Sequence, residues 1–229
     1  MSSSTHVIAD VRRMRERFLE GSVEAQTLRP TLLESWRRSQ ALRVHPDRLE
    51  LPYVREPNTD SQLVHAAAPA LRQITEDVAA EAVTVILTSA DGVVLQREVP
   101  EGTLMKALDS VSLAPGYSYA EEFAGSLETG QPAFIRGSEH FVGKLDRLAC
   151  AGAPIRDPIS QRVVGVVDLT CWASHSDSVL FGWPKAPPAG SKNECKHRRM
   201  RAKPRWWTRI SNRPGAFRSA YSRSAATSC

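Results

Sequence analysis

The apolar pattern of the first 80 residues predicts three helices and one linker. A first helix is indicated by apolar residues at spacings of four, three and four, which line one face: Val7, Val11, Met14 and Phe18. Thr31 and Glu34 have the spacing of a capping box, so a second helix is expected to begin there. Arg43 to Thr59 contains three prolines and is typical of an extended linker.

The third helix is expected over roughly residues 61 to 80. Its apolar positions fall on one face and are Leu63, Ala67, Leu71, Ile74 and Val78. Pro69 lies in the middle of this stretch, where a proline removes one helical hydrogen bond and kinks the helix or makes it begin again.

The middle of the chain predicts strands. Val83 to Thr88 and Val93 to Glu98 are strand-like runs, and Ala90-Asp91-Gly92 between them suits a tight hairpin turn. A short helix is indicated by Leu104, Met105, Leu108 and Val111. A further strand over Gln131 to Arg136 and a helix over His140 to Asp146 are also expected.

A second hairpin is predicted by two apolar runs with turn-forming residues between them. Leu148 to Ile155 is small and apolar, and Val163 to Leu169 is rich in β-branched residues. Small residues around Gly152 leave space above one strand, which either a packed helix or a ligand could occupy. Strands joined by hairpins, together with helices at the ends, predict an α+β fold with a largely antiparallel central sheet flanked by helices.

Several motifs carry a family resemblance. CAGAPIRDP at 150–158, followed by GVVDLT at 165–170, resembles the closing hairpin of the GAF-type sensor domain at the N-terminus of bacterial activators related to the acetoin-catabolism regulator. RPTLLESWRRSQALRVHPDRL at 29–49 is similar to that family's N-terminal signature, SLAPGYSYAEEFAG at 112–125 to its central loop, and GQPAFIRGSEHF at 130–141 to its next strand and helix.

The resemblance implies a central sheet with helices on one face and a ligand pocket under loops on the other. It also implies a sensory module of a transcription regulator that binds a small organic effector and forms a homodimer through its N-terminal helices. The domain organisation expected from it is an N-terminal helical segment and linker over 1–59, a GAF-like sensor domain over 60–181 and a basic tail over 182–229.

Six residues are candidates for ligand contact in such a pocket: Tyr117, Tyr119, Glu122, Phe123, Cys150 and Asp168. The first four lie in the central loop. The alternative to a pocket wall there is a mobile, partly solvated loop that contacts no ligand. Asp168 interrupts an apolar strand, and a buried carboxylate needs a partner, so ordinary structural pairing, for example with an arginine, is favoured over ligand recognition. Cys150 and Cys171 are most simply buried thiols.

The chain departs from the family at two places. The family's glycine-rich segment after the central loop is missing, and Gly125 to Glu128 joins its two flanks directly. Near Phe181 the family's long connecting helix is replaced by a basic, proline-rich sequence. Translation in a shifted reading frame produces such a change, and we favour this explanation, which predicts a truncated regulator without its DNA-binding output.

Charge and composition narrow the function. The net charge of +5 conceals a tail with 12 Lys or Arg and one acid, while the rest of the chain is mildly acidic. The sequence predicts no cofactor. It predicts no metal site, because His65 and His140 are isolated from other metal-ligating residues. It predicts no membrane segment and a cytoplasmic location, because long apolar runs are missing.

Two alternatives to a non-enzymatic sensor remain. Trp206 and Trp207 within the basic tail would suit non-specific nucleic-acid binding by phosphate neutralisation and base stacking. A cysteine-dependent GAF-type reductase is the other, with Cys150 as its nucleophile.

The composition of the tail yields a first prediction. Residues 182–229 should be disordered, because 12 basic groups repel one another and five prolines interrupt regular structure. Their backbone amides should exchange with solvent rapidly in a hydrogen-exchange measurement. Slow exchange across Arg205 to Arg209 would reveal a folded element and favour the nucleic-acid alternative.

Overall fold

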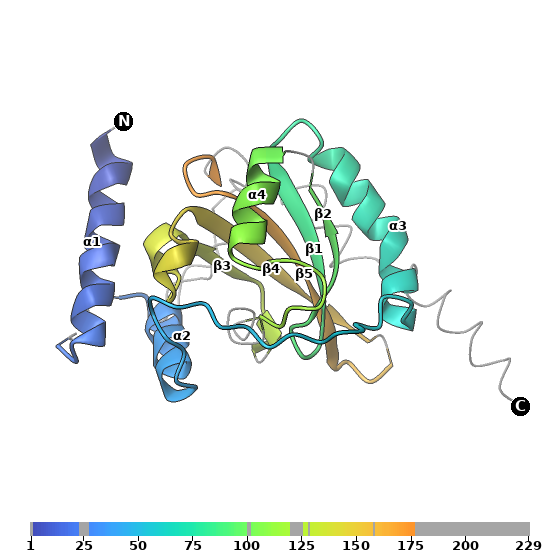
Figure 1. The fold of residues 1–229 in the computed structure, drawn as a ribbon, viewed down its shortest axis with the longest axis horizontal. Helices are drawn as coiled ribbons and strands as arrows, with labels where there is room; N and C mark the ends of the chain where they lie inside the picture. The colour runs from blue at the N-terminus through green and yellow to red at the C-terminus, as the bar shows by residue number, and fades with distance from the viewer. Residues whose placement is uncertain are drawn as a thin grey trace, which may run out of the picture.

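The computed structural model describes residues 2–22, 28–99, 102–119, 126–127, 129–157 and 159–176, with backbone alone for residues 2–10. The helices are α1 (Ser2–Leu19), α2 (Pro30–Ala41), α3 (Gln62–Asp77) and α4 (Gly102–Ser110), and the single-turn 3-10 helices are η1 (Gly137–Glu139) and η2 (Gly143–Leu145). The strands are β1 (Val83–Ser89), β2 (Val94–Glu98), β3 (Ala133–Arg136), β4 (Leu148–Arg156) and β5 (Val163–Trp172) (Figure 1). The predicted α+β class is confirmed.

One five-stranded antiparallel sheet organises the fold, in the order β2-β1-β5-β4-β3. The two predicted hairpins are both present, and Gly92 takes the positive φ of 71° that the first turn requires. β5 lies at the centre, where Leu169 is opposite Val85 on one side and Ala151 on the other. The hairpin with the family motif therefore forms the middle of the sheet.

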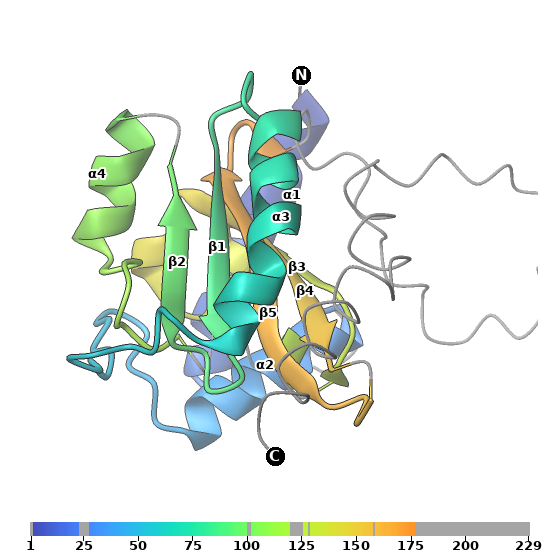
Figure 2. The ribbon, with the colours of Figure 1, turned by 90° about the vertical axis from the view of Figure 1, so that its right-hand side faces the viewer.

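Helices cover both faces of the sheet. α3 packs on one face, with its predicted apolar side against alternate residues of β1, β4 and β5 (Figure 2). On the opposite face a second apolar cluster joins α1, α2 and α4 to the sheet and to the loops, with Trp36 fully buried in it. The expectation of helices on one face only is therefore wrong, because the apolar side of α4 is buried in the cluster on the opposite face, which α1 and α2 join through the segment around η1.

The predicted start of α2 is wrong in detail, and α3 does not restart at Pro69. α2 begins at Pro30, one residue before the expected capping box, and its N-cap Arg29 makes no side-chain cap. Proline suits the first helical position, since its missing N–H would have no partner there. α3 begins after Ser61, whose hydroxyl accepts from the Val64 amide, and continues through Pro69 without a new start.

The helix expected over His140 to Asp146 is also wrong. His140 itself is extended, with φ −62° and ψ 139°, and only η1 and η2 flank it. The carbonyl oxygen of His140 accepts a hydrogen bond of 2.9 Å from the Arg15 guanidinium. This tertiary contact occupies the carbonyl oxygen that an α-helix would use in its own backbone hydrogen bonds.

The linker after α2 has no helix, as predicted. Its only described pairing with a strand-like segment is a single bridge between Tyr53 and Tyr117, whose rings lie 4.8 Å apart. Glu122, Phe123 and the basic tail lie outside the described residues.

The central position of β5 yields a prediction on stability. Val167 is 4% exposed and packs in the cluster under α3, so Val167→Asp would bury a charge without a partner and lower the free energy of unfolding by about 3 to 5 kcal/mol. Ile159→Asp is the control, because Ile159 is 78% exposed in the β4–β5 turn. Chemical denaturation measures both, and an unchanged midpoint for Val167→Asp would contradict the assignment of β5 to the sheet interior.

Candidate functional site

A cavity of about 40 Å³ lies on the sheet face opposite α3. Its lining comes from β3, β4, β5 and the segments around them: Leu113, Tyr119, Ser126, Ala133, Ile135, His140, Leu145, Leu148, Cys150, Gly152 and Asp168. One water needs roughly 10 to 15 Å³ on this scale, so the cavity has room for a molecule of a few non-hydrogen atoms. Most of the lining is apolar.

Alternation along β4 and β5 supplies the floor of the cavity. Side chains of a strand point alternately to opposite faces, so Leu169 and Cys171 pack under α3 while Asp168 faces the cavity. Gly152 of β4 is opposite Asp168 in the register. A Cβ at Gly152 would lie 3.0 Å from the Ser126 hydroxyl oxygen, and that hydroxyl donates to the Gly152 carbonyl at 3.1 Å. The missing side chain lets Ser126 approach the strand closely.

Asp168 has one satisfied and one unsatisfied carboxyl oxygen. It is 1% exposed, and its Oδ2 accepts a hydrogen bond of 2.5 Å from the Thr170 hydroxyl. Its Oδ1 is buried and makes no hydrogen bond of full geometry with the described residues, although the backbone of Ala151 is close enough to act on the carboxyl. Burial raises the pKa of this carboxyl from 3.8 to about 7, although the hydrogen bond from Thr170 and a weaker one from the Ala151 backbone oppose the shift. Asp168 therefore has a structural partner, as expected, but within the described residues that partner is a hydroxyl and not an arginine.

His140 also brings an unsatisfied atom to the cavity. Its Nδ1 lies 2.9 Å from the Gly137 carbonyl oxygen, which can only accept, so Nδ1 carries the proton. Nε2 is buried and has no hydrogen-bond partner. Burial lowers the pKa of the imidazole from 6.5 to about 4, so the ring is neutral at pH 7 and Nε2 is a bare acceptor.

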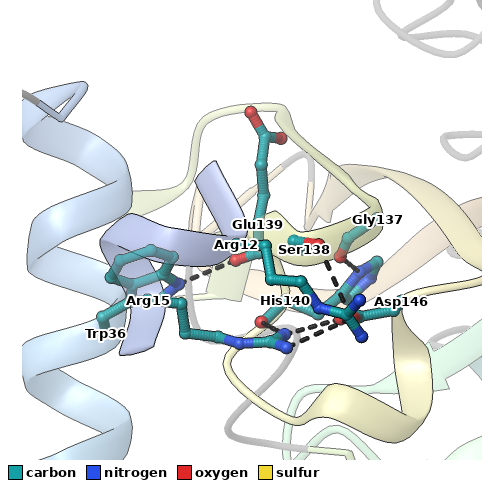
Figure 3. A network of polar contacts seen from close by, with 8 residues as sticks. All are labelled: Arg12, Arg15, Trp36, Gly137, Ser138, Glu139, His140 and Asp146. Carbon is teal, nitrogen blue, oxygen red and sulfur yellow. Dashed lines mark hydrogen bonds and ion pairs between the residues drawn. The ribbon is translucent and has the colours of Figure 1, made fainter. Parts of the chain in front are cut away.

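α1 and α2 hold the segment that carries His140 (Figure 3). The Arg15 guanidinium donates to both Asp146 carboxylate oxygens, at 2.5 and 3.1 Å, as well as to the His140 carbonyl. The Trp36 indole N–H donates to the Glu139 carbonyl at 2.8 Å, and Arg29 forms an ion pair of 2.7 Å with the Glu139 carboxylate. These contacts fix the backbone on both sides of the imidazole, where the chain has only the single-turn helices η1 and η2.

The structure brings together three of the six residues that the sequence nominates. Tyr119, Cys150 and Asp168 line the cavity. Tyr117 packs on Tyr53 instead and is not among the described lining residues, while Glu122 and Phe123 lie outside the described part of the chain. His140 and Ser126 are lining residues that the sequence does not nominate. Neither residue belongs to a periodic apolar pattern in the sequence. Only the tertiary structure shows that both reach the same cavity.

The two cysteines that the structure describes lie on opposite faces of the sheet and form no dithiol centre. Cys150 faces the cavity, with Sγ 3.4 Å from the Thr170 hydroxyl, whereas Cys171 is buried under α3 on the opposite face of the sheet. Burial raises the pKa of the Cys171 thiol to about 12. Within the described residues no group of three metal-ligating side chains forms, and no helix is long and apolar enough to cross a membrane.

Comparison with known proteins gives the family. The model described as the MimR N-terminal domain matches residues 7–195. The chain belongs to the MimR N-terminal domain family. The match passes Phe181, where the sequence alone indicated that the family pattern ends.

Relatives of this MimR-type domain are transcriptional activators. The propane 2-monooxygenase operon transcriptional activator MimR of Mycolicibacterium goodii is 56% identical over 198 residues, which cover 83% of this chain and 34% of the relative. The acetoin dehydrogenase operon transcriptional activator AcoR of Bacillus subtilis is 25% identical over 176 residues, 71% of this chain and 29% of AcoR, which confirms the resemblance stated from the motifs. The chain thus spans about a third of the length of these curated relatives.

A solved structure agrees with the fold. The DhaR N-terminal part in the E. coli DhaR(N)–DhaL complex superposes with a TM-score of 0.58 at 18% identity, over 66% of this chain and 56% of that one. The MimR-type domain therefore shares the α+β architecture of that N-terminal region.

The buried carboxyl yields a prediction on pH dependence. The pKa of Asp168 is higher in the folded state than in the unfolded state, so the folded state binds more protons between about pH 4 and pH 7 and the contribution of Asp168 to stability falls as pH rises through that window. Asp168→Asn should match the wild type at pH 4. Above pH 4 the free energy of unfolding of Asp168→Asn should exceed that of the wild type by a further amount of about 1.4 kcal/mol per pH unit, up to about pH 7.

The measurement is urea denaturation of both proteins across this pH range. His140 changes stability in the opposite direction over a similar window, because its pKa is lowered, but it is common to both proteins and cancels in the difference. A difference that does not vary with pH would show that the carboxyl is solvated.

Proposed function

We propose that this chain is the effector-sensing module of a transcriptional activator and that the effector binds in the cavity above β4 and β5. The observation that supports this most strongly is a mainly apolar cavity whose lining residues include two buried polar atoms that make no full hydrogen bond to the described protein, Asp168 Oδ1 and His140 Nε2. Unpaired buried polar atoms cost free energy, and a bound ligand that pairs with them recovers it.

The size of the cavity supports an effector of very few carbon atoms. Its volume of about 40 Å³ is too small for an aromatic or sugar ligand without rearrangement of the lining. The activators MimR and AcoR are named for operons of propane 2-monooxygenase and acetoin dehydrogenase. We therefore propose an effector on the scale of propane, its oxidation products or acetoin.

The contacts of α1 and α2 supply a route from the cavity to the rest of the regulator. Both helices contact the segment from Gly137 to Asp146, and that segment places His140 in the cavity wall. A ligand that shifts His140 would change the contacts of Arg15 and Trp36. The same helices are proposed as the homodimer surface, and the function needs no catalysis.

Blocking the cavity tests this proposal. Ala133→Leu adds three carbon atoms to a side chain that lines the cavity. Of propane, 2-propanol, acetone and acetoin, those that bind to the wild type should no longer bind to this variant. Ala80→Leu is the matched control, because Ala80 is exposed just after α3, remote from the cavity lining. Titration of each compound into ¹⁵N-labelled protein, followed by two-dimensional NMR, measures binding and locates it.

Wild type should show saturable shifts for residues of the cavity lining, and Ala133→Leu should show none while its fold is intact. If none of these compounds moves the signals of the lining residues in wild type, or if Ala133→Leu binds them unchanged, the proposed function is wrong.

A further inference from the structure

The two unpaired polar atoms of the cavity define a pattern of hydrogen-bond donors and acceptors. His140 Nε2 is held as an acceptor, because Nδ1 donates to the Gly137 carbonyl. This assignment comes from geometry: a carbonyl oxygen has no proton to give, so the proton of the neutral ring is on Nδ1. A ligand that satisfies Nε2 must present an N–H or O–H group.

Asp168 supplies the complementary group. Thr170 donates to Oδ2, which leaves Oδ1 as the atom available to a ligand. Burial raises the pKa of this carboxyl to about 7, so the uncharged acid is populated alongside the carboxylate at neutral pH, and the acid can donate from Oδ1. A ligand that satisfies the acid must present an acceptor. A hydroxyl group is both donor and acceptor at a single atom.

Charge in the cavity selects against ionised ligands. None of its described lining residues is a lysine or arginine, so an anionic ligand such as a carboxylate finds no counter-ion. The Arg15 guanidinium is occupied by Asp146 and by the His140 carbonyl. A cationic ligand would meet only Asp168, and would have to leave water for an apolar site to do so.

We propose that the cavity recognises a small uncharged alcohol, whose hydroxyl group donates to His140 Nε2 and accepts from the Asp168 carboxyl while its short carbon skeleton packs on the apolar lining. This inference rests on the proposed function, because it places the ligand in the same cavity. It narrows the ligand from small organic molecules in general to those with a hydroxyl group. Ser126, Ile135 and Leu148 are in position to contact the carbon skeleton.

Wild type tests the proposal directly through three probes of similar size. 2-Propanol satisfies both atoms, acetone can only accept, and isopropylammonium can only donate and is charged. NMR titration should give 2-propanol a dissociation constant about tenfold or more below those of the other two, since a buried polar atom left unpaired weakens binding by at least that factor.

Two variants assign the preference to named atoms. His140→Phe removes the acceptor and should lower the affinity for 2-propanol to that for acetone, with His65→Phe as control because His65 is exposed on α3. Asp168→Asn keeps a donor and an acceptor at this position and should retain the preference for 2-propanol. Asp168→Val removes both and should weaken 2-propanol about tenfold. Denaturation midpoints establish that each variant is folded.

The outcomes separate this inference from the proposed function. If acetone or propane binds as tightly as 2-propanol and Ala133→Leu still blocks them, the cavity is the sensor site but the hydroxyl preference is wrong. If isopropylammonium binds most tightly, Asp168 acts as a carboxylate counter-ion and the proposal is overturned. Retention of the full preference in Asp168→Val would overturn the role of that carboxyl.

Discussion

The alternation of side chains along β4 and β5 is the constraint on which the rest of this structure depends. Both strands are largely buried on their two faces, so alternate residues pack either in the core under α3 or on the face that bears the cavity. A shift of one residue in register would place Asp168 under α3 and Leu169 in the cavity. The polar atoms of the cavity are therefore fixed by the same pairing that stabilises the sheet.

The opposite wall of the cavity is held differently. Around His140 the chain has only two single-turn helices, and its backbone is fixed by side chains of α1 and α2. Arg15 and Asp146 are both largely buried, and loss of one partner would leave the other charge unpaired in the interior. The aromatic rings of Phe18 and Trp36, with centroids 5.4 Å apart, pack the two helices together beside it. A change in this wall therefore reaches both N-terminal helices.

The sequence predicts the sheet and the helices well because local pattern determines them. β4 and β5 follow from apolar runs flanking turn formers, and the apolar face of α3 follows from its helical spacing. The segment from His140 to Asp146 is wrongly predicted as a helix because its local pattern permits one. The competing contact comes from Arg15, 125 residues earlier in the chain, and no local pattern reports it.

The candidate site is predictable only in part, for the same reason. Asp168 is conspicuous as a carboxylate inside an apolar strand. Its partner, however, is the hydroxyl of Thr170, two residues further along the same strand, and not a distant arginine. His140 can be weighed from the sequence only as a metal ligand. Its role depends on the Gly137 carbonyl, which directs the proton to Nδ1, and on a cavity that forms only when β3, β4 and β5 assemble.

The state of the His140 ring tests the proposed recognition of an alcohol most directly. Long-range ¹H–¹⁵N correlation NMR of the histidine rings distinguishes a protonated from a bare nitrogen, and assignment is made by comparison with His140→Phe. At pH 7 His140 should be neutral with the proton on Nδ1, and 2-propanol should shift the Nε2 resonance in the direction of an accepted hydrogen bond. A proton on Nε2 in the free protein, or an Nε2 resonance that does not respond to saturating 2-propanol, would contradict this recognition.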